Sequence, residues 1–131
     1  MLDHVSITVT DMFAAERFYD AVMAALGVAK IGASERWIGY GLRADAAHPD
    51  RAYLALYRGE RRPDDAHGRH WCFKAETRAA VDAFWRAGLA QGGVDDGAPG
   101  LRPRYHPDYY GAFLRDPDGN RVEAVCHRAE A

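Results

Sequence analysis

The chain has 131 residues, of which 48% are hydrophobic and 27% are charged, and its formal net charge is −2. This length fits one compact domain, and the balanced charge argues against the basic surface that nucleic acids and anionic membranes attract. No apolar run approaches the roughly 20 residues of a membrane span, and Met1 leads directly into alternating sequence without a signal-like leader. We therefore expect a cytoplasmic protein without nucleic-acid or membrane partners.

The first predicted element is a strand in LDHVSITVTD, residues 2–11, because apolar and polar side chains alternate there. Asp11 is the expected N-cap of a helix whose apolar residues recur at helical spacing as far as Leu26, before Gly27. Strands are expected next in 30–34, 36–43 and 52–58. The apolar face of the first strand holds Val5, Ile7 and Val9, and its polar face holds His4, Ser6 and Thr8.

The same pattern begins again with RHWCFKAE, residues 69–76. Thr77 is the expected N-cap of a second helix, and strands are expected in 94–104, 109–115 and 120–127. In three pairs of similar residues, the two members are separated by the same number of positions along the chain, which indicates an internal duplication. These pairs are His4 with His70, Phe18 with Phe84, and the helix-closing Gly27 with Gly93.

The duplication predicts an α+β fold. Two tandem βαβββ modules, related by a pseudo-twofold axis, would form a curved mixed β-sheet cup with the helices on the outside. Module 1 would span residues 1–58 and module 2 residues 69–128 of a single domain, 1–131. The charged stretch 59–68 contains Pro63 and lacks periodicity, so it is the expected linker.

Glu123 is a carboxylate inside the last predicted strand, where a charge needs solvent or a specific partner. If its neighbours Val122 and Ala124 pack on a helix, Glu123 faces the inside of the cup, as His4 and His70 do. Two imidazoles and a carboxylate are a common metal-binding set, and three protein ligands leave open positions for substrate. The strand phases place Cys72 and Cys126 on opposite faces of a sheet, which argues against a disulfide.

The segments LDHVSITVTD, RHWCFKA and especially FLRDPDGNRVEAV resemble the vicinal oxygen chelate superfamily. This superfamily includes glyoxalase I, fosfomycin-resistance enzymes, extradiol dioxygenases and bleomycin-binding proteins, and the resemblance covers essentially the whole chain. It implies that His4, His70 and Glu123 hold one divalent metal ion (Fe, Zn, Mn or Ni). It also implies a homodimer with a small-molecule substrate, whose cup is completed within one chain or by modules of two chains.

The chain departs from the family at two positions. Ala55 stands where glyoxalase I has a second glutamate, which serves as ligand and base, and Phe113 stands where many dioxygenases and fosfomycin-resistance enzymes have a tyrosine. Ser6 resembles a hydroxyl with which the fosfomycin enzymes position their substrate. No known subfamily pattern is fully met.

The remaining predicted site residues lie on the inner wall of the cup or beside its mouth. Tyr109 and His106 are candidate helpers in proton transfer, beside Glu123 as a catalytic residue, although His106 also fits a loop histidine without a role. His127, at the end of the last strand, is expected to face solvent. The inner wall should offer a substrate pocket with aromatic lining, made by Ser6, Trp37, Tyr53, Ala55, Tyr57, Cys72, Lys74, Phe113 and Arg121.

Together these features favour a metal-dependent enzyme whose metal ion acts as a Lewis acid on a small substrate with vicinal oxygens. A glyoxalase-like lyase or isomerase reaction is preferred. An Fe(II) extradiol-type dioxygenase and a thiol transferase of the fosfomycin-resistance type are alternatives within this class. The alternative outside it is a non-catalytic protein of the bleomycin-resistance type that binds a small molecule.

Overall fold

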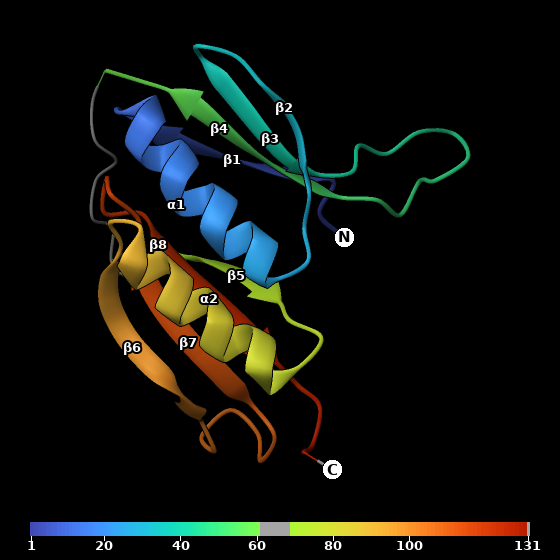
Figure 1. Cartoon of the computed structure of the whole chain (residues 1–131). Helices are drawn as coiled ribbons and strands as arrows, with labels where there is room; N and C mark the ends of the chain where they lie inside the picture. Colours follow the sequence, from blue (N-terminus) through green and yellow to red (C-terminus); the bar gives the residue numbers. More distant parts are fainter. Residues whose placement is uncertain (61–68, 131) are drawn as a thin grey trace.

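The computed structural model describes residues 1–60 and 69–130, and the same order of elements occurs twice in it (Figure 1). The first module consists of β1 (His4–Val9), α1 (Met12–Ala25), β2 (Lys30–Ala33), β3 (Trp37–Gly41) and β4 (Tyr53–Arg58). The second consists of β5 (Trp71–Lys74), α2 (Arg78–Ala90), β6 (Val94–Leu101), β7 (Tyr110–Arg115) and β8 (Arg121–Cys126).

Each module forms one open four-stranded sheet, in the orders β1-β4-β3-β2 and β5-β8-β7-β6. β1 pairs with β4 and β5 with β8 in parallel, and the other pairs are antiparallel. The predicted α+β fold of two tandem βαβββ modules is therefore confirmed. The registers also match, because Ser6 lies opposite Ala55 and Cys72 lies opposite Glu123. Ala55 thus occupies the position in module 1 that Glu123 occupies in module 2.

Both helices begin at the predicted caps. Asp11 accepts a hydrogen bond from the Ala14 amide, and Thr77 accepts one from the Ala80 amide. The closing glycine of the first helix is the predicted one, and that of the second helix differs by one residue from the prediction. The left-handed conformation that closes a helix falls on Gly27, with φ 74°, and on Gly92, with φ 88°, rather than on Gly93. The second helix is one residue shorter than the first, which moves its closing glycine one position earlier.

The helices lie side by side, so the two modules share one hydrophobic core (Figure 1). Phe18 of α1 and Phe84 of α2 are both completely buried. Gly88 allows the close approach of α2, since an added Cβ would lie 2.3 Å from Cδ1 of Leu114 and 3.1 Å from Cε2 of Phe18.

The turn DPDGN between β7 and β8 connects module 2 to module 1 through buried carboxylates. Asp116 accepts hydrogen bonds from the Tyr19 hydroxyl at 2.7 Å and from the backbone and side chain of Asn120, both at 2.8 Å. Asp118 accepts from the backbone amide and hydroxyl of Thr10, at 2.9 and 2.6 Å. The motif that carries the family resemblance therefore fixes the entry of β8, the strand that carries Glu123.

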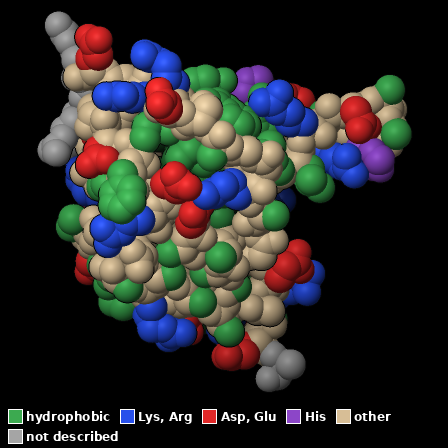
Figure 2. All heavy atoms as spheres, turned by 45° about the horizontal axis from the view of Figure 1, so that its top comes forward, with side chains coloured by type: hydrophobic (Ala, Val, Ile, Leu, Met, Phe, Trp, Pro, Cys, Tyr) green, Lys and Arg blue, Asp and Glu red, His purple; other side chains and the backbone are tan. Residues whose placement is uncertain are grey.

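Between β3 and β4, residues 42–52 form a loop that projects from the body of the protein (Figure 1). Acidic and basic side chains are interspersed over the face shown in Figure 2. No helix among the described residues is long and apolar enough to cross a membrane. Most of the predicted linker, residues 61–68, lies outside the described residues. Both cysteines are free, and only Cys126 is buried.

Candidate functional site

Strand register determines which side chains share the sheet face that points away from the helices. On the first sheet His4 lies opposite Tyr53, and Thr8 lies opposite Tyr57. On the second sheet Glu123 lies between Cys72 on β5 and Phe113 on β7. The predicted pocket residues divide between these faces: Ser6, Trp37, Tyr53, Ala55 and Tyr57 on the first sheet, and Cys72, Lys74, Phe113 and Arg121 on the second.

Glu123 is the centre of a polar cluster on the second sheet. Its side chain is only 2% exposed, and its Oε2 lies 3.1 Å from Nε2 of His70, which directly precedes β5. Its Oε1 accepts a short hydrogen bond from the hydroxyl of Tyr109. Gly111 leaves room for this contact, because an added Cβ would lie 3.2 Å from Oε1 of Glu123 and 3.1 Å from Tyr109 Cε1.

The carboxylate of Glu123 affects the groups that touch it. Desolvation, followed by the nearby charge of Glu123, raises the pKa of the Cys72 thiol to about 12. Desolvation and the hydrogen bond to Glu123 also raise the pKa of Tyr109 well above its ordinary value. Both groups are therefore protonated at neutral pH, and Tyr109 is a donor to Glu123 rather than a base.

His4 lies on the first module. Its Nδ1 is 2.7 Å from a carboxylate oxygen of Asp3, and its ring stacks on Tyr53 with the centroids 5.0 Å apart. Within residues 1–60 and 69–130, no group of three or more His, Cys, Asp or Glu side chains is arranged to hold a metal ion. A single chain thus brings His70 and Glu123 together and leaves the third predicted ligand, His4, on the other sheet.

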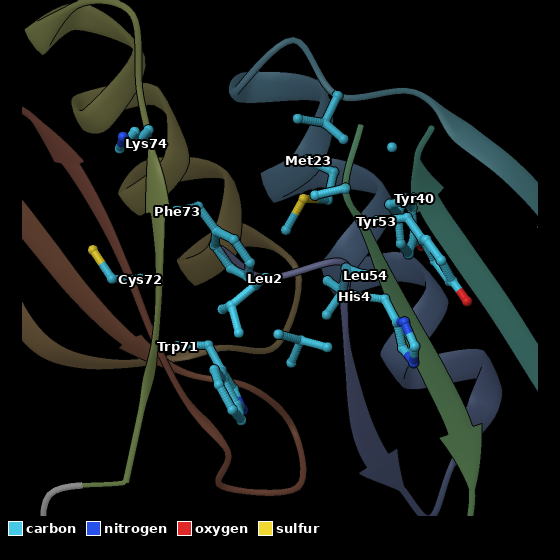
Figure 3. A pocket seen from close by; sticks show the side chains of 14 residues that line it. Leu2, His4, Met23, Tyr40, Tyr53, Leu54, Trp71, Cys72, Phe73 and Lys74 are labelled. Atoms are coloured by element: carbon cyan, nitrogen blue, oxygen red, sulfur yellow. The ribbon is translucent and has the colours of Figure 1, made fainter. Parts of the chain in front are cut away.

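An apolar cavity of about 300 Å³ lies between the two modules (Figure 3). Trp71 and Phe73 of β5 point into it from one side, and Leu54 of β4 lies on the other side with His4. Cys72 and Lys74 border the cavity, but their side chains point away from it, toward the face that carries Glu123. The cavity and the Glu123 cluster are therefore on opposite faces of β5.

The aromatic residues of the first sheet form a second surface. The ring of Trp37 lies over Gly32 and Gly39, where an added Cβ would come within 2.8 and 2.4 Å of it. The guanidinium of Arg43 lies 5.2 Å from the ring centre of Trp37 and 5.1 Å from that of Tyr53. Trp37 Nε1 is buried without a hydrogen-bond partner.

Two predicted polar residues have protein partners. The Nε of Arg121, one of the predicted pocket residues, lies 4.0 Å from a carboxylate oxygen of Asp96. His106 has both ring nitrogens engaged: Nδ1 accepts from the Asp108 backbone amide at 3.1 Å, and Nε2 lies 2.8 Å from Nδ1 of His127. His127 is exposed, as predicted, but it also has this partner.

Sequence reasoning missed Gly111, Arg43 and the pairing of His127. Gly111 follows two tyrosines on a predicted strand, and a glycine inside a strand is a known signal of close approach. The contacts of Arg43 and His127 depend on loop conformation, for which the sequence offers no signal.

The fold and this site define the class of protein. Residues 1–124 match the family model described as the Glyoxalase/Bleomycin resistance protein/Dioxygenase superfamily. A glyoxalase/bleomycin resistance protein from Albidiferax ferrireducens T118 is 30% identical, with 97% of this chain and 98% of that chain covered and a TM-score of 0.79. The chain belongs to this superfamily. No curated protein in the comparison matches it.

More distant structures have the same fold. A glyoxalase-related enzyme from Fulvimarina pelagi is 17% identical, with 96% of this chain and 87% of that chain covered and a TM-score of 0.71. A lactoylglutathione lyase from Agrobacterium tumefaciens is 22% identical, with 96% and 92% covered and a TM-score of 0.60. Members of the superfamily generally use a divalent metal ion, typically bind small molecules and often dimerise.

Proposed function

We propose that this chain is a divalent-metal-dependent enzyme that acts on a small substrate with two neighbouring oxygen atoms, with a glyoxalase-type lyase or isomerase reaction favoured. The observation that carries the proposal is the buried carboxylate of Glu123 with the His70 imidazole 3.1 Å away. Burying a carboxylate costs free energy unless it is hydrogen-bonded or paired with a cation. Tyr109 offsets part of that cost by donating to Oε1 of Glu123, and a divalent cation held by the carboxylate and the imidazole would offset more of it.

The donor set fits such an ion. Two imidazoles and one carboxylate, from His4, His70 and Glu123, suit Zn, Fe, Mn or Ni, and the bound ion would supply Lewis-acid stabilisation of negative charge on substrate oxygens. Tyr109 holds the orientation of Glu123 by donating to its Oε1. The methyl group of Ala55 accepts no proton, so proton transfer falls to groups other than a second glutamate.

The complete ligand set requires two copies of the chain. His70 and Glu123 belong to module 2, whereas His4 belongs to module 1 and has separate contacts. In a homodimer that sets module 1 of one copy against module 2 of the other, the partner's His4 approaches His70 and Glu123. This arrangement is one of the two that the family resemblance allows.

The apolar cavity supports a second candidate function, the binding of a hydrophobic ligand without chemistry. Its volume of about 300 Å³ is at the lower end of small-molecule sites. This candidate requires no metal, so metal content separates the two functions.

The first experiment measures metal per chain after incubation with Fe(II), Zn, Mn or Ni and removal of excess ion. Wild type should retain about one ion per site for at least one metal, and His70→Ala and Glu123→Gln should lose it. His48→Ala is the matched control, because His48 lies in the projecting loop and contacts Asp45. Wild-type protein without metal would favour the binding function, and full retention in His70→Ala would refute the ligand set.

The second experiment measures turnover by the metal-loaded protein. A hemithioacetal, a catechol and fosfomycin with a thiol represent the lyase, dioxygenase and transferase reactions. We expect turnover of the hemithioacetal at the highest rate, with loss of activity in Glu123→Gln. Rates equal to the protein-free blank for all three would eliminate the three reactions.

A further inference from the structure

Two histidines outside the predicted ligand set form a pair beside Tyr109. Nε2 of His106, in the loop that leads to β7, lies 2.8 Å from Nδ1 of His127, which follows β8. Their rings are nearly parallel, with an angle of 26° and centroids 5.1 Å apart. The pair therefore joins the 102–109 loop to the end of the strand that carries Glu123.

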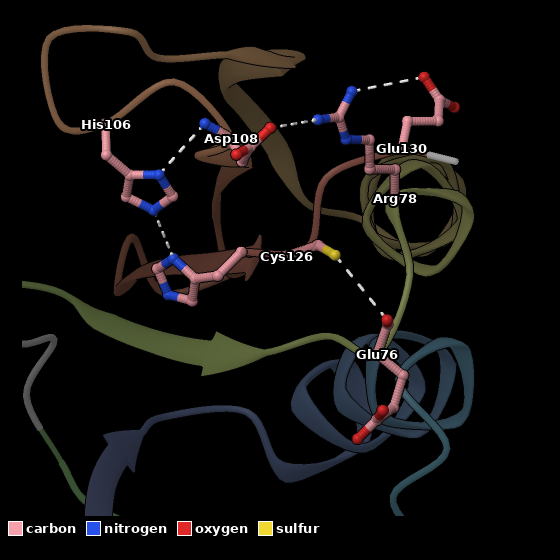
Figure 4. Close-up of polar contacts among 7 residues, drawn as sticks. Glu76, Arg78, His106, Asp108, Cys126 and Glu130 are labelled. Carbon is pink, nitrogen blue, oxygen red and sulfur yellow. Dashed lines mark hydrogen bonds and ion pairs between the residues drawn. The ribbon is translucent and has the colours of Figure 1, made fainter.

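The hydrogen bonds assign the tautomers of both rings. Nδ1 of His106 faces the backbone amide of Asp108 at 3.1 Å (Figure 4). An amide N–H only donates, so Nδ1 of His106 carries no proton and its Nε2 is the protonated nitrogen. That Nε2–H donates to Nδ1 of His127, which must likewise be unprotonated, so the proton of neutral His127 is on its Nε2. Asp108 is itself held by Arg78, whose guanidinium lies 3.7 Å from its carboxylate (Figure 4).

The pair packs against the ring of Tyr109. The ring centroids of Tyr109 and His106 are 5.6 Å apart at 73°, and those of Tyr109 and His127 are 5.4 Å apart at 82°. Both are edge-to-face contacts, the favoured geometry of aromatic pairs. The hydroxyl at the far end of this ring is the one that donates to Glu123.

We infer that His106 and His127 are positioning residues, which hold the ring of Tyr109 so that its hydroxyl fixes the orientation of Glu123. The inference rests on the proposed function, because Glu123 is a ligand only if the site holds a metal. Groups that orient a metal ligand commonly change metal affinity by about 10- to 100-fold when they are lost. The hydrogen bond from His106 to His127 thus acts on the metal site through Tyr109, without contact to the ion or the substrate.

Two substitutions of His127 separate this role from simple packing. His127→Phe keeps an aromatic ring against Tyr109 but removes the acceptor for His106, whereas His127→Gln keeps an acceptor and removes the ring. We expect the Zn²⁺ dissociation constant, measured by chelator competition, to rise about tenfold in both variants, because His127→Phe loses the hydrogen bond that holds His106 and His127→Gln loses the ring contact with Tyr109. If the pair were simple packing, His127→Phe would bind Zn²⁺ as tightly as wild type, and wild-type affinity in either variant would overturn the inference.

A second measurement needs neither metal nor substrate. In the metal-free protein with ¹⁵N-labelled histidine, long-range ¹H–¹⁵N spectra distinguish protonated from unprotonated ring nitrogens. Above neutral pH, His106 and His127 should both show protonated Nε2 and unprotonated Nδ1. A protonated Nδ1 on His106 would overturn the inference even if the protein binds metal. Absence of Zn²⁺ binding by wild type, with the expected tautomers, would instead overturn the proposed function.

Discussion

The hydroxyl of Tyr19 should make a measurable contribution to stability through the turn that precedes β8. Tyr19 is completely buried, and it donates at 2.7 Å to Asp116, whose side chain is 2% exposed. Tyr19→Phe removes this hydrogen bond without changing the shape of the ring. A hydrogen bond to a charged group contributes about 1.5–3 kcal/mol. Asp116 keeps its other donors, so we expect a loss of about 2 kcal/mol in the free energy of unfolding.

Tyr40→Phe is the matched control. Tyr40 is also buried and donates at 2.8 Å to Asp20, but the side chain of Asp20 is 43% exposed. Water therefore replaces the lost donor, and the expected loss is below about 1 kcal/mol. Urea denaturation followed by tryptophan fluorescence measures both variants, with an unchanged m-value as the test of two-state behaviour. A loss below about 0.5 kcal/mol in Tyr19→Phe, or a larger loss in Tyr40→Phe, would refute the reasoning.

The pH dependence provides a second test of the same contact. Burial raises the pKa of Asp116, and the hydrogen bond from Tyr19 partly opposes that shift. Because the folded pKa lies above the unfolded value, the ionised carboxylate costs stability at neutral pH, and the cost disappears as pH falls through the folded pKa. Tyr19→Phe raises this pKa further. The loss in free energy of unfolding of Tyr19→Phe relative to wild type should therefore be largest at neutral pH and should become smaller in acid.

Three further predictions concern the site and the helix contact. Ala55→Glu, which restores a carboxylate at a position 1% exposed, should destabilise the metal-free protein and raise its metal affinity at least about tenfold in competition assays; unchanged affinity would contradict the alignment of positions 55 and 123. In metal-free protein at pH 8, the raised pKa should make alkylation of Cys72 at least severalfold slower than that of an ordinary thiol. Glu123→Gln should accelerate the alkylation, which mass spectrometry measures. Gly88→Val should lower the free energy of unfolding by about 2–3 kcal/mol through overpacking, measured in the same urea assay. Ala90→Val, at an exposed position of the same helix, should lower it by about 1 kcal/mol or less. Equal losses in the two variants would argue against a close helix contact at Gly88.

The sequence predicted the local features of the fold because each rests on short-range physics. Alternation defined which strand residues share a face, and the register later placed Ser6 opposite Ala55 and Cys72 opposite Glu123. Asp11 and Thr77 were identified as caps because short polar side chains satisfy the first free amides of a helix. The one-residue error at Gly93 arose because the duplication was assumed to be of constant length, whereas helix ends vary by a residue.

The site was only partly predictable, because strand phase gives the face of a residue but not its distance from residues on another sheet. Glu123 and His70 belong to neighbouring strands of one module, and the structure places them in contact. His4 lies on the corresponding face of its strand but belongs to the other module. The placement of that module depends on helix packing and on the hydrogen bonds that Thr10 donates to Asp118. These hydrogen bonds join residues far apart in sequence, and the periodicity of the sequence does not reveal them.

The central claim is that His4 of one copy and the His70–Glu123 pair of another hold one metal ion. Mixing the two variants His4→Ala and Glu123→Gln under conditions of subunit exchange tests it directly. Neither variant alone completes a site, but a mixed dimer has one intact site, formed by His4 of the Glu123→Gln chain with His70 and Glu123 of the His4→Ala chain. The account predicts that metal binding, absent from each variant, returns on mixing to at most one ion per mixed dimer. No recovery after demonstrated exchange would contradict a site shared between two chains.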